Sequence, residues 1–129
     1  MARHDMQVNG SKRSVQADAD SPLLYVLRDQ FELQNPAAAV GSKKVTTLEG
    51  LGSSAKPSPL QQAFIDEQAA QCGYCISGMV IQAADLLKRT PKPSELQTRE
   101  GLAMNLCRCG THQRIVRAVQ RASGQPVTA

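Results

Sequence analysis

The chain has 129 residues, a formal net charge of +4, no tryptophan, two phenylalanines and two tyrosines. A chain of this length forms one ordinary domain or two very small ones, and aliphatic side chains must supply most of the core. The scarcity of aromatic residues removes the platforms on which nucleic-acid bases stack, so we expect no nucleic-acid partner. The spaced basic residues of the C-terminal half suit a solvated helix face, or a surface that meets an acidic partner subunit or an anionic cofactor.

No targeting segment is recognisable in the sequence. The first ten residues, MARHDMQVNG, lack the apolar core of a secretory signal, and no stretch is long enough to cross a bilayer. We therefore expect a cytoplasmic protein with no membrane span. In that reducing compartment, four cysteines favour metal ligation or redox chemistry over disulfide bonds.

The first part of the chain predicts a hairpin followed by one helix. An Asn9-Gly10 turn signal lies between two short segments of alternating apolar residues, which favours a β-hairpin. Ser21-Pro22 is typical of a helix start, and this helix should end before Pro36. Its apolar face consists of Leu23, Leu24, Val26, Leu27 and Phe31.

The middle of the chain predicts a short strand, a linker and two helices. A strand is expected over 45–48, and the Gly-, Ser- and Pro-rich residues 51–57 are typical of a linker. Ser58, Pro59 and Gln61 combine an N-cap, a first-turn proline and a capping box, which predicts a helix over 59–70. A second helix should follow Cys75 directly and stop at Thr90-Pro91.

Two further helices are expected near the C-terminus. Ser94 and Gln97 repeat the capping box and begin a helix that should end near Cys107. Thr111 can cap the last helix, and Gly124 lies beyond its end. The residues expected to face the core are Leu96, Leu102, Ala103 and Leu106 in the first of these helices, and Ile115, Ala118, Val119 and Ala122 in the second.

The four cysteines form two closely spaced pairs. Cys72 and Cys75 make a C-x2-C pair, and Cys107 and Cys109 a C-x-C pair. Each pair precedes a predicted helix, so that unpaired N–H groups and the positive end of the helix dipole can face the thiolates. An antiparallel bundle of four short helices brings the two pairs together, which predicts one site with four soft ligands.

The spacing alone supports a zinc staple as well as an iron–sulfur cluster. A structural zinc ion also takes four thiolates, and small domains often depend on one. His112 could enter a zinc site through a C-x-C-x-x-H arrangement, although a place on the helix face is the favoured role for it. A redox-active C-x-x-C would need a βαβ context, which the sequence does not show.

A family resemblance rests on QCGYCISGM at 71–79 and NLCRCGTHQRIVRAV at 105–119. In this order they resemble the second [2Fe–2S] domain of the molybdenum hydroxylases, which include xanthine dehydrogenase, aldehyde oxidoreductase and the small subunits of nicotinate dehydrogenase and isoquinoline 1-oxidoreductase. The match covers residues 58–123, and the stretch up to the first cysteine pair is most similar to the nicotinate and isoquinoline small subunits. The resemblance implies that the four cysteines hold a [2Fe–2S] cluster and that Gln71 lies near the molybdopterin of a large partner subunit.

The N-terminal part resembles the plant-type ferredoxin domain that precedes the helical domain in this family. MQVNG, SPLLYVLRDQF and KKVTTLEGLG carry this similarity. The C-x4-C-x2-C segment and a fourth cysteine of that domain are missing, because the chain runs from Asn35-Pro36 straight into Ala37-Ala38. With no cysteine before Cys72, one cluster is expected in this chain.

The expected fold class is α+β, a remnant of a β-grasp ferredoxin-like domain followed by a four-helix [2Fe–2S]-binding bundle. Its parts are a truncated domain over 1–50, a linker over 51–57, the helical domain over 58–123 and a tail over 124–129. No catalytic residue is expected.

The implied function is that of an electron-transfer subunit of a molybdopterin-dependent hydroxylase whose substrate is an N-heterocycle or aldehyde, with a flavin or cytochrome subunit serving as the electron acceptor. The alternatives are a zinc-stapled interaction module and a truncated subunit that docks but cannot pass electrons onward.

Overall fold

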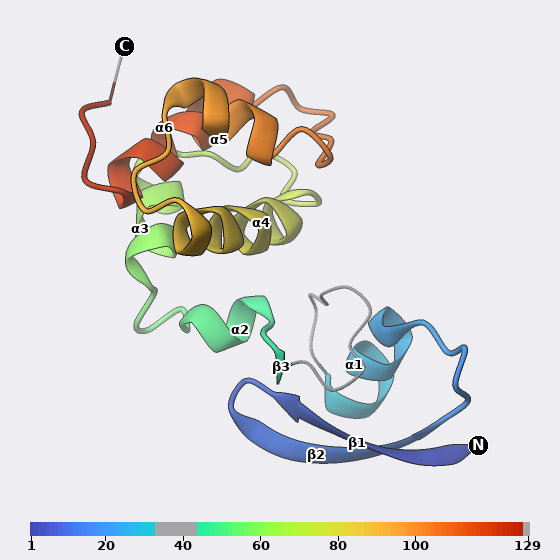
Figure 1. Cartoon of the computed structure of the whole chain (residues 1–129). Helices are drawn as coiled ribbons and strands as arrows, with labels where there is room; N and C mark the ends of the chain where they lie inside the picture. The colour runs from blue at the N-terminus through green and yellow to red at the C-terminus, as the bar shows by residue number, and fades with distance from the viewer. Residues whose placement is uncertain (33–43, 128–129) are drawn as a thin grey trace. The chain divides into compact units, whose positions relative to one another are not determined.

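The computed structural model describes residues 1–32 and 44–127, which fall into two compact units, Met1–Ser53 and Ser54–Ala129. The first unit contains a small sheet and two helices, and the second is helical (Figure 1). The expected helix end before Pro36 and the junction from Asn35-Pro36 to Ala37-Ala38 lie outside the described residues. Among the described residues, no helix has the length and apolarity to cross a membrane.

The N-terminal unit begins with the predicted hairpin. Strands β1 (Ala2–Val8) and β2 (Ser11–Ala17) pair antiparallel, with Val8 opposite Ser11. The two turn residues both have positive φ angles, 49° at Asn9 and 82° at Gly10. This backbone twist matches that of the flanking strands, and Asn and Gly are the residues that adopt it most readily. The hairpin prediction is confirmed.

The strand expected over 45–48 is shorter than predicted. Strand β3 (Lys44–Val45) pairs parallel with β1 and gives the sheet order β2-β1-β3. The Asn9 side chain then accepts a hydrogen bond from the Thr47 N–H and donates one to Thr47 Oγ1, both at 2.9 Å. These bonds hold Thr47 out of the strand, and it becomes the N-cap of helix α2 (Leu48–Leu51), which the sequence did not predict.

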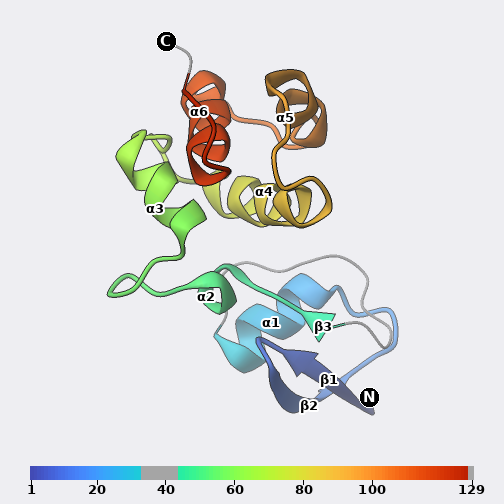
Figure 2. The ribbon, with the colours of Figure 1, turned by 60° about the vertical axis from the view of Figure 1, so that its left-hand side comes forward.

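Helix α1 (Leu23–Phe31) covers one face of this sheet (Figures 1 and 2). It follows Pro22, as predicted, and Glu32 ends it with a φ of 55°. Its side chains complete two small apolar clusters. One consists of Val8, Leu27 and Val45, and the other of Val15, Ala17 and Val26.

The helical unit contains α3 (Pro59–Asp66), α4 (Ile76–Arg89), α5 (Glu95–Gly101) and α6 (His112–Ala122). Both predicted capping boxes are present. Ser58 Oγ accepts from the Gln61 N–H at 3.3 Å while Gln61 Oε1 accepts from the Ser58 N–H at 2.8 Å. Ser94 and Gln97 repeat the arrangement at 3.2 and 2.8 Å. Helix α3 ends earlier than predicted, and Gln68 just beyond it has a φ of 49°.

In the helical unit, α3 packs against α6, and α4 and α5 complete the core. The buried apolar side chains are Leu60, Ala63, Phe64, Ala69, Met79, Val80, Ala83, Leu86, Leu102, Ile115, Val116, Ala118 and Val119. The prediction that three residues of the third helix face the core is wrong, since Leu96, Ala103 and Leu106 are exposed. Helix α5 stops at Gly101, so the helical spacing on which that prediction depended does not continue to Cys107.

One acidic side chain joins α3 to α6. Glu67 Oε2 lies 3.1 Å from Arg117 Nε, and Glu67 Oε1 lies 2.6 Å from Arg121 Nη2. Its side chain is only 9% exposed. The hydrogen bond from Arg121, together with that from Arg117, holds the pKa of Glu67 below its usual 4.5 although burial acts to raise it.

We predict that Glu67→Gln lowers the free energy of unfolding of the helical unit by about 1 kcal/mol at pH 7, the upper range for partly exposed ion pairs. Because the pKa of folded Glu67 is depressed, this stabilisation is complete above pH 4.5 and is lost as the pH falls through the lower folded pKa. Urea unfolding of both proteins over a pH series measures it. In the control Glu95→Gln, which removes an exposed pair with Arg99, the loss should be only a few tenths of a kcal/mol. Equal losses in the two variants would contradict the prediction.

Candidate metal centre

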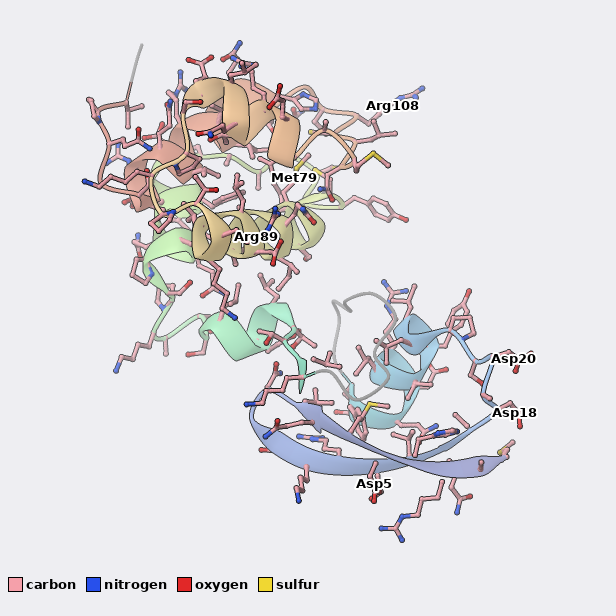
Figure 3. All side chains as sticks on the ribbon, viewed as in Figure 1. Asp5, Asp18, Asp20, Met79, Arg89 and Arg108 are labelled. Atoms are coloured by element: carbon pink, nitrogen blue, oxygen red, sulfur yellow. The ribbon has the colours of Figure 1, made fainter. Side chains whose placement is uncertain are left out.

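The two cysteine pairs lie at the starts of α4 and α6. Cys75 is the residue immediately before α4, and Cys107 and Cys109 lie in the loop between α5 and α6. Each loop reverses at a glycine with a positive φ, 82° at Gly73 and 76° at Gly110. These angles are strained for other residues, so both sharp turns depend on glycine. Figure 3 shows Arg108, which separates the last two cysteines, extending away from the helices.

The structure brings all four sequence-predicted cysteines together. Cys72 lies beside Cys109, and Cys75 beside Cys107, close enough for each side chain to shift the pKa of its neighbour. Each contact therefore joins one cysteine of the first loop to one of the second. Cys72 is exposed and the other three are half-buried, so the group of thiols lies at the surface of the helical unit.

The thiols of each pair differ in acidity. A hydrogen bond from the Thr111 hydroxyl lowers the pKa of Cys107 to about 6, whereas burial raises the pKa of its partner Cys75 to about 11. The Tyr74 backbone N–H lowers the pKa of Cys72. The Cys72 backbone acts to lower the pKa of Cys109, but the hydrogen bond to the Cys72 side chain and burial raise it. The Cys107 thiol is thus the one that most readily takes the thiolate form that a metal requires of its ligand.

The side chain of Thr111 makes a different contact from the helix cap that the sequence predicted. It is the residue before α6, as expected, but its side chain makes no hydrogen bond to the helix backbone. Its hydroxyl lies 3.4 Å from Cys107 Sγ instead, and the residue is buried. Sequence reasoning missed this contact, although the spacing of four residues between Cys107 and Thr111 was a signal for it.

The donor set fits a two-iron cluster better than a single ion. Among the described residues, no three His, Cys, Asp or Glu side chains are arranged to hold one metal ion. A zinc staple requires four ligands around one centre. A [2Fe–2S] cluster instead takes two thiolates at each of two irons, so two separate thiol pairs match it. His112 is exposed on α6 and joins no such group with the described side chains.

A cavity of about 260 Å³ adjoins Cys109. Gln71, Gly110, Thr111, Arg114 and Arg117 also line it. Gln71 is exposed and directly precedes Cys72. It lines the same cavity as Cys109 of the second pair. The two arginines were not singled out from the sequence, because their spacing on α6 also suits an ordinary solvated helix face.

Comparison with known proteins gives consistent matches. Residues 47–120 match the family model described as the [2Fe-2S] binding domain. The chain is 46% identical to a nicotinate dehydrogenase subunit of Pseudomonas putida, over 92% of each chain. It is 40% identical to the alpha chain of isoquinoline 1-oxidoreductase of Brevundimonas diminuta, over 86% of this chain and 90% of that one.

A solved structure has the same fold. The aldehyde oxidoreductase from Desulfovibrio desulfuricans superimposes with a TM-score of 0.88 and 29% identity, covering 96% of this chain and 17% of that one. The match to the nicotinate dehydrogenase subunit runs over 145 aligned positions, more than the 129 residues of this chain. That relative therefore contains residues within the aligned region that have no counterpart here.

Proposed function

This chain belongs to the [2Fe–2S] binding-domain family, in the iron–sulfur small subunits of molybdenum hydroxylases, and we propose that its four cysteines together hold one cluster. It is accordingly a non-catalytic electron-transfer subunit of an oxidoreductase. The observation that supports the ligand assignment is the meeting of Cys72 with Cys109 and of Cys75 with Cys107. A zinc-stapled module is not favoured, since the family match and the paired thiols both point to iron and sulfide.

The bound group supplies one-electron redox chemistry, and the chain positions and tunes it. Cysteines from both loops provide anionic ligands, and the Thr111 hydroxyl donates to Cys107 Sγ. Hydrogen bonds to sulfur stabilise the more negative, reduced state and so raise the reduction potential. The N-terminal N–H groups of α4 and α6 act in the same direction. Gln71, on the cavity beside Cys109, is the residue that we place next to the molybdopterin of the partner.

We propose different roles for the two units of the chain. We assign α3 to α6, within residues 58–123, as a four-helix cluster-binding bundle. The N-terminal unit, within residues 1–50, is proposed to be a remnant of a β-grasp ferredoxin-like domain. Its hairpin, its helix and a third strand parallel to central β1 support this. Residues 51–57 would be the linker and 124–129 the tail.

A single cluster per chain is part of the proposal. No cysteine precedes Cys72, and the alignment with a relative contains positions that this chain lacks. The proposed partners are a flavin or cytochrome subunit, which accepts the electrons, and a molybdopterin-binding large subunit. A cytoplasmic location would keep the thiols reduced for cluster assembly. The alternative of a docking subunit that cannot pass electrons onward is not favoured, since the relatives are subunits of oxidoreductases.

The substrate class proposed for the assembled enzyme is an N-heterocycle. The two relatives with the highest identities given above act on such compounds by name, nicotinate and isoquinoline. An aldehyde is the alternative, from the solved structure with 29% identity. The reaction itself would take place on the partner subunit, so this chain alone should oxidise neither compound.

We predict that replacing any one of the four cysteines with serine abolishes the cluster, because an alkoxide is a harder and much less readily formed ligand than a thiolate. Anaerobic reconstitution followed by iron and acid-labile sulfide analysis tests this. Wild-type iron and sulfide contents in two or more of the four variants would defeat the ligand assignment.

The second prediction concerns stoichiometry. A chain whose four thiols all lie in the helical unit should bind about two iron atoms and two sulfides, not the four of a two-cluster relative. Iron analysis and electron paramagnetic resonance of the reduced protein count the clusters. Four irons per chain, or two distinct paramagnetic signals, would contradict the single-cluster proposal.

The third prediction concerns Thr111. Thr111→Val removes the hydroxyl near Cys107 Sγ with little change of shape, so the reduction potential of the cluster should fall. Thr111→Ser keeps the hydroxyl and serves as the control, with a potential close to that of the wild type. Redox titration followed by paramagnetic resonance measures all three proteins. A valine variant with the same potential as the serine variant would show that this contact does not tune the site.

A further inference from the structure

A glycine near the start of helix α4 lies against the loop that carries the second cysteine pair. Gly78 is the third residue of α4 and follows Cys75 by three positions. An alanine at this position would place its Cβ 3.3 Å from Asn105 Oδ1, and among the described residues no other atom outside its own helix and chain neighbours comes within 4 Å. Asn105 precedes Cys107 by two residues. The contact therefore joins the helix after the first cysteine pair to the loop of the second.

The backbone conformation gives no reason for a glycine at position 78. Gly78 lies inside a helix of 14 residues, and the positive φ angles of the described chain occur at other glycines. Glycine inside a helix is destabilising relative to alanine, because it loses more conformational freedom on folding. What glycine provides here is space. A Cβ would lie closer to Asn105 Oδ1 than ordinary van der Waals contact allows, so the amide would have to move by a few tenths of an ångström.

Asn105 is a polar residue with a more buried side chain than its apolar neighbours. Met104 and Leu106 are 94% and 86% exposed, whereas Asn105 between them is half-buried. Its backbone N–H donates to Leu102 O at 2.9 Å, just beyond α5. Within residues 1–32 and 44–127, no hydrogen bond engages its carboxamide. The usual order of polar and apolar side chains is thus reversed here, and the carboxamide occupies the space that Gly78 leaves.

The start of α4 also suits an amide oxygen electrostatically. Cys75 is the N-cap residue, and its side chain makes no capping hydrogen bond. The first N–H groups of a helix lack partners within the helix and give this end a partial positive charge. The carboxamide oxygen of Asn105 carries the negative end of the amide dipole and lies beside this turn. Space and charge therefore both favour the Asn105 side chain at this place.

We propose that Asn105 is a positioning residue that holds the second cysteine loop against the start of α4 and so sets the separation of the two cysteine pairs. The inference rests on the proposed function, because this separation matters only if the four thiols share one cluster. Asn105 supplies no ligand and acts through the positions of Cys75 and Cys107. Removal of a residue that orients metal ligands typically weakens metal binding by about 10- to 100-fold.

A double-mutant cycle on the full-length chain with its cluster tests the contact. Asn105→Ala and Gly78→Ala should each release iron to an excess of chelator at least about fivefold faster than the wild type. Each should also change the paramagnetic resonance spectrum of the reduced cluster, since each displaces Cys107 relative to Cys75. Alanine is the better helix former, so without the contact Gly78→Ala should slow the release. Once Asn105→Ala has removed the oxygen, adding Gly78→Ala should therefore make the release no faster.

The matched control is Met104→Ala, which truncates the exposed neighbour of Asn105 in the same loop. It should keep the wild-type spectrum and release iron within about twofold of the wild-type rate, as is usual for surface substitutions. Release from Asn105→Ala at the control rate, slower release from Gly78→Ala, or additive effects in the double variant would overturn the role of Asn105 while leaving the cluster assignment intact. A wild-type chain without a [2Fe–2S] signal after reconstitution would overturn the proposed function itself.

Discussion

The meeting of two cysteine loops at the starts of two helices is the constraint that the packing of the helical unit has to satisfy. Four cysteine side chains in the thiolate form repel one another unless some of them are protonated or they bind a metal. In the structure, the Thr111 hydroxyl lies 3.4 Å from Cys107 Sγ and lowers the pKa of that thiol, which favours its thiolate. The helix starts add positive partial charge at the same place. The position of α4 relative to α6 therefore decides whether the site exists.

Contacts distant from the cysteines support that position. Glu67 fixes the end of α3 to α6 through two arginines, and the buried faces of α4 and α6 contribute Met79 and Ile115 to the same core. Figure 3 shows Met79 within this unit, whereas Arg108 extends from its edge. The packed interior thus keeps the two loops in register, and the side chains outside the core are left to contact another protein.

In the N-terminal unit, a side-chain contact between Asn9 and Thr47 joins two segments that are far apart in the sequence. Asn9, in the hairpin turn, binds the backbone and side chain of Thr47 and so connects β1 to the segment after β3. The parallel pairing of β3 with β1 gives the sheet its order, β2-β1-β3. The described residues of this unit form only two small apolar clusters, as is expected for a unit of this size.

The sequence by itself determined the features that depend on neighbouring residues. These are the Asn9-Gly10 hairpin, the capping boxes at Ser58 and Ser94, the stop of α4 before Pro91 and the family, all of which follow from short motifs. Only the tertiary structure decided which thiols pair, that Thr111 bonds to Cys107, and that Leu96 and Leu106 are exposed. These features depend on residues far apart in the chain. Helical spacing predicted Leu106 in the core because the spacing alone could not show that α5 ends at Gly101. Helix α5 packs against α4, and the chain beyond Gly101 turns toward the second cysteine pair, so Leu106 is not on the buried face of a helix.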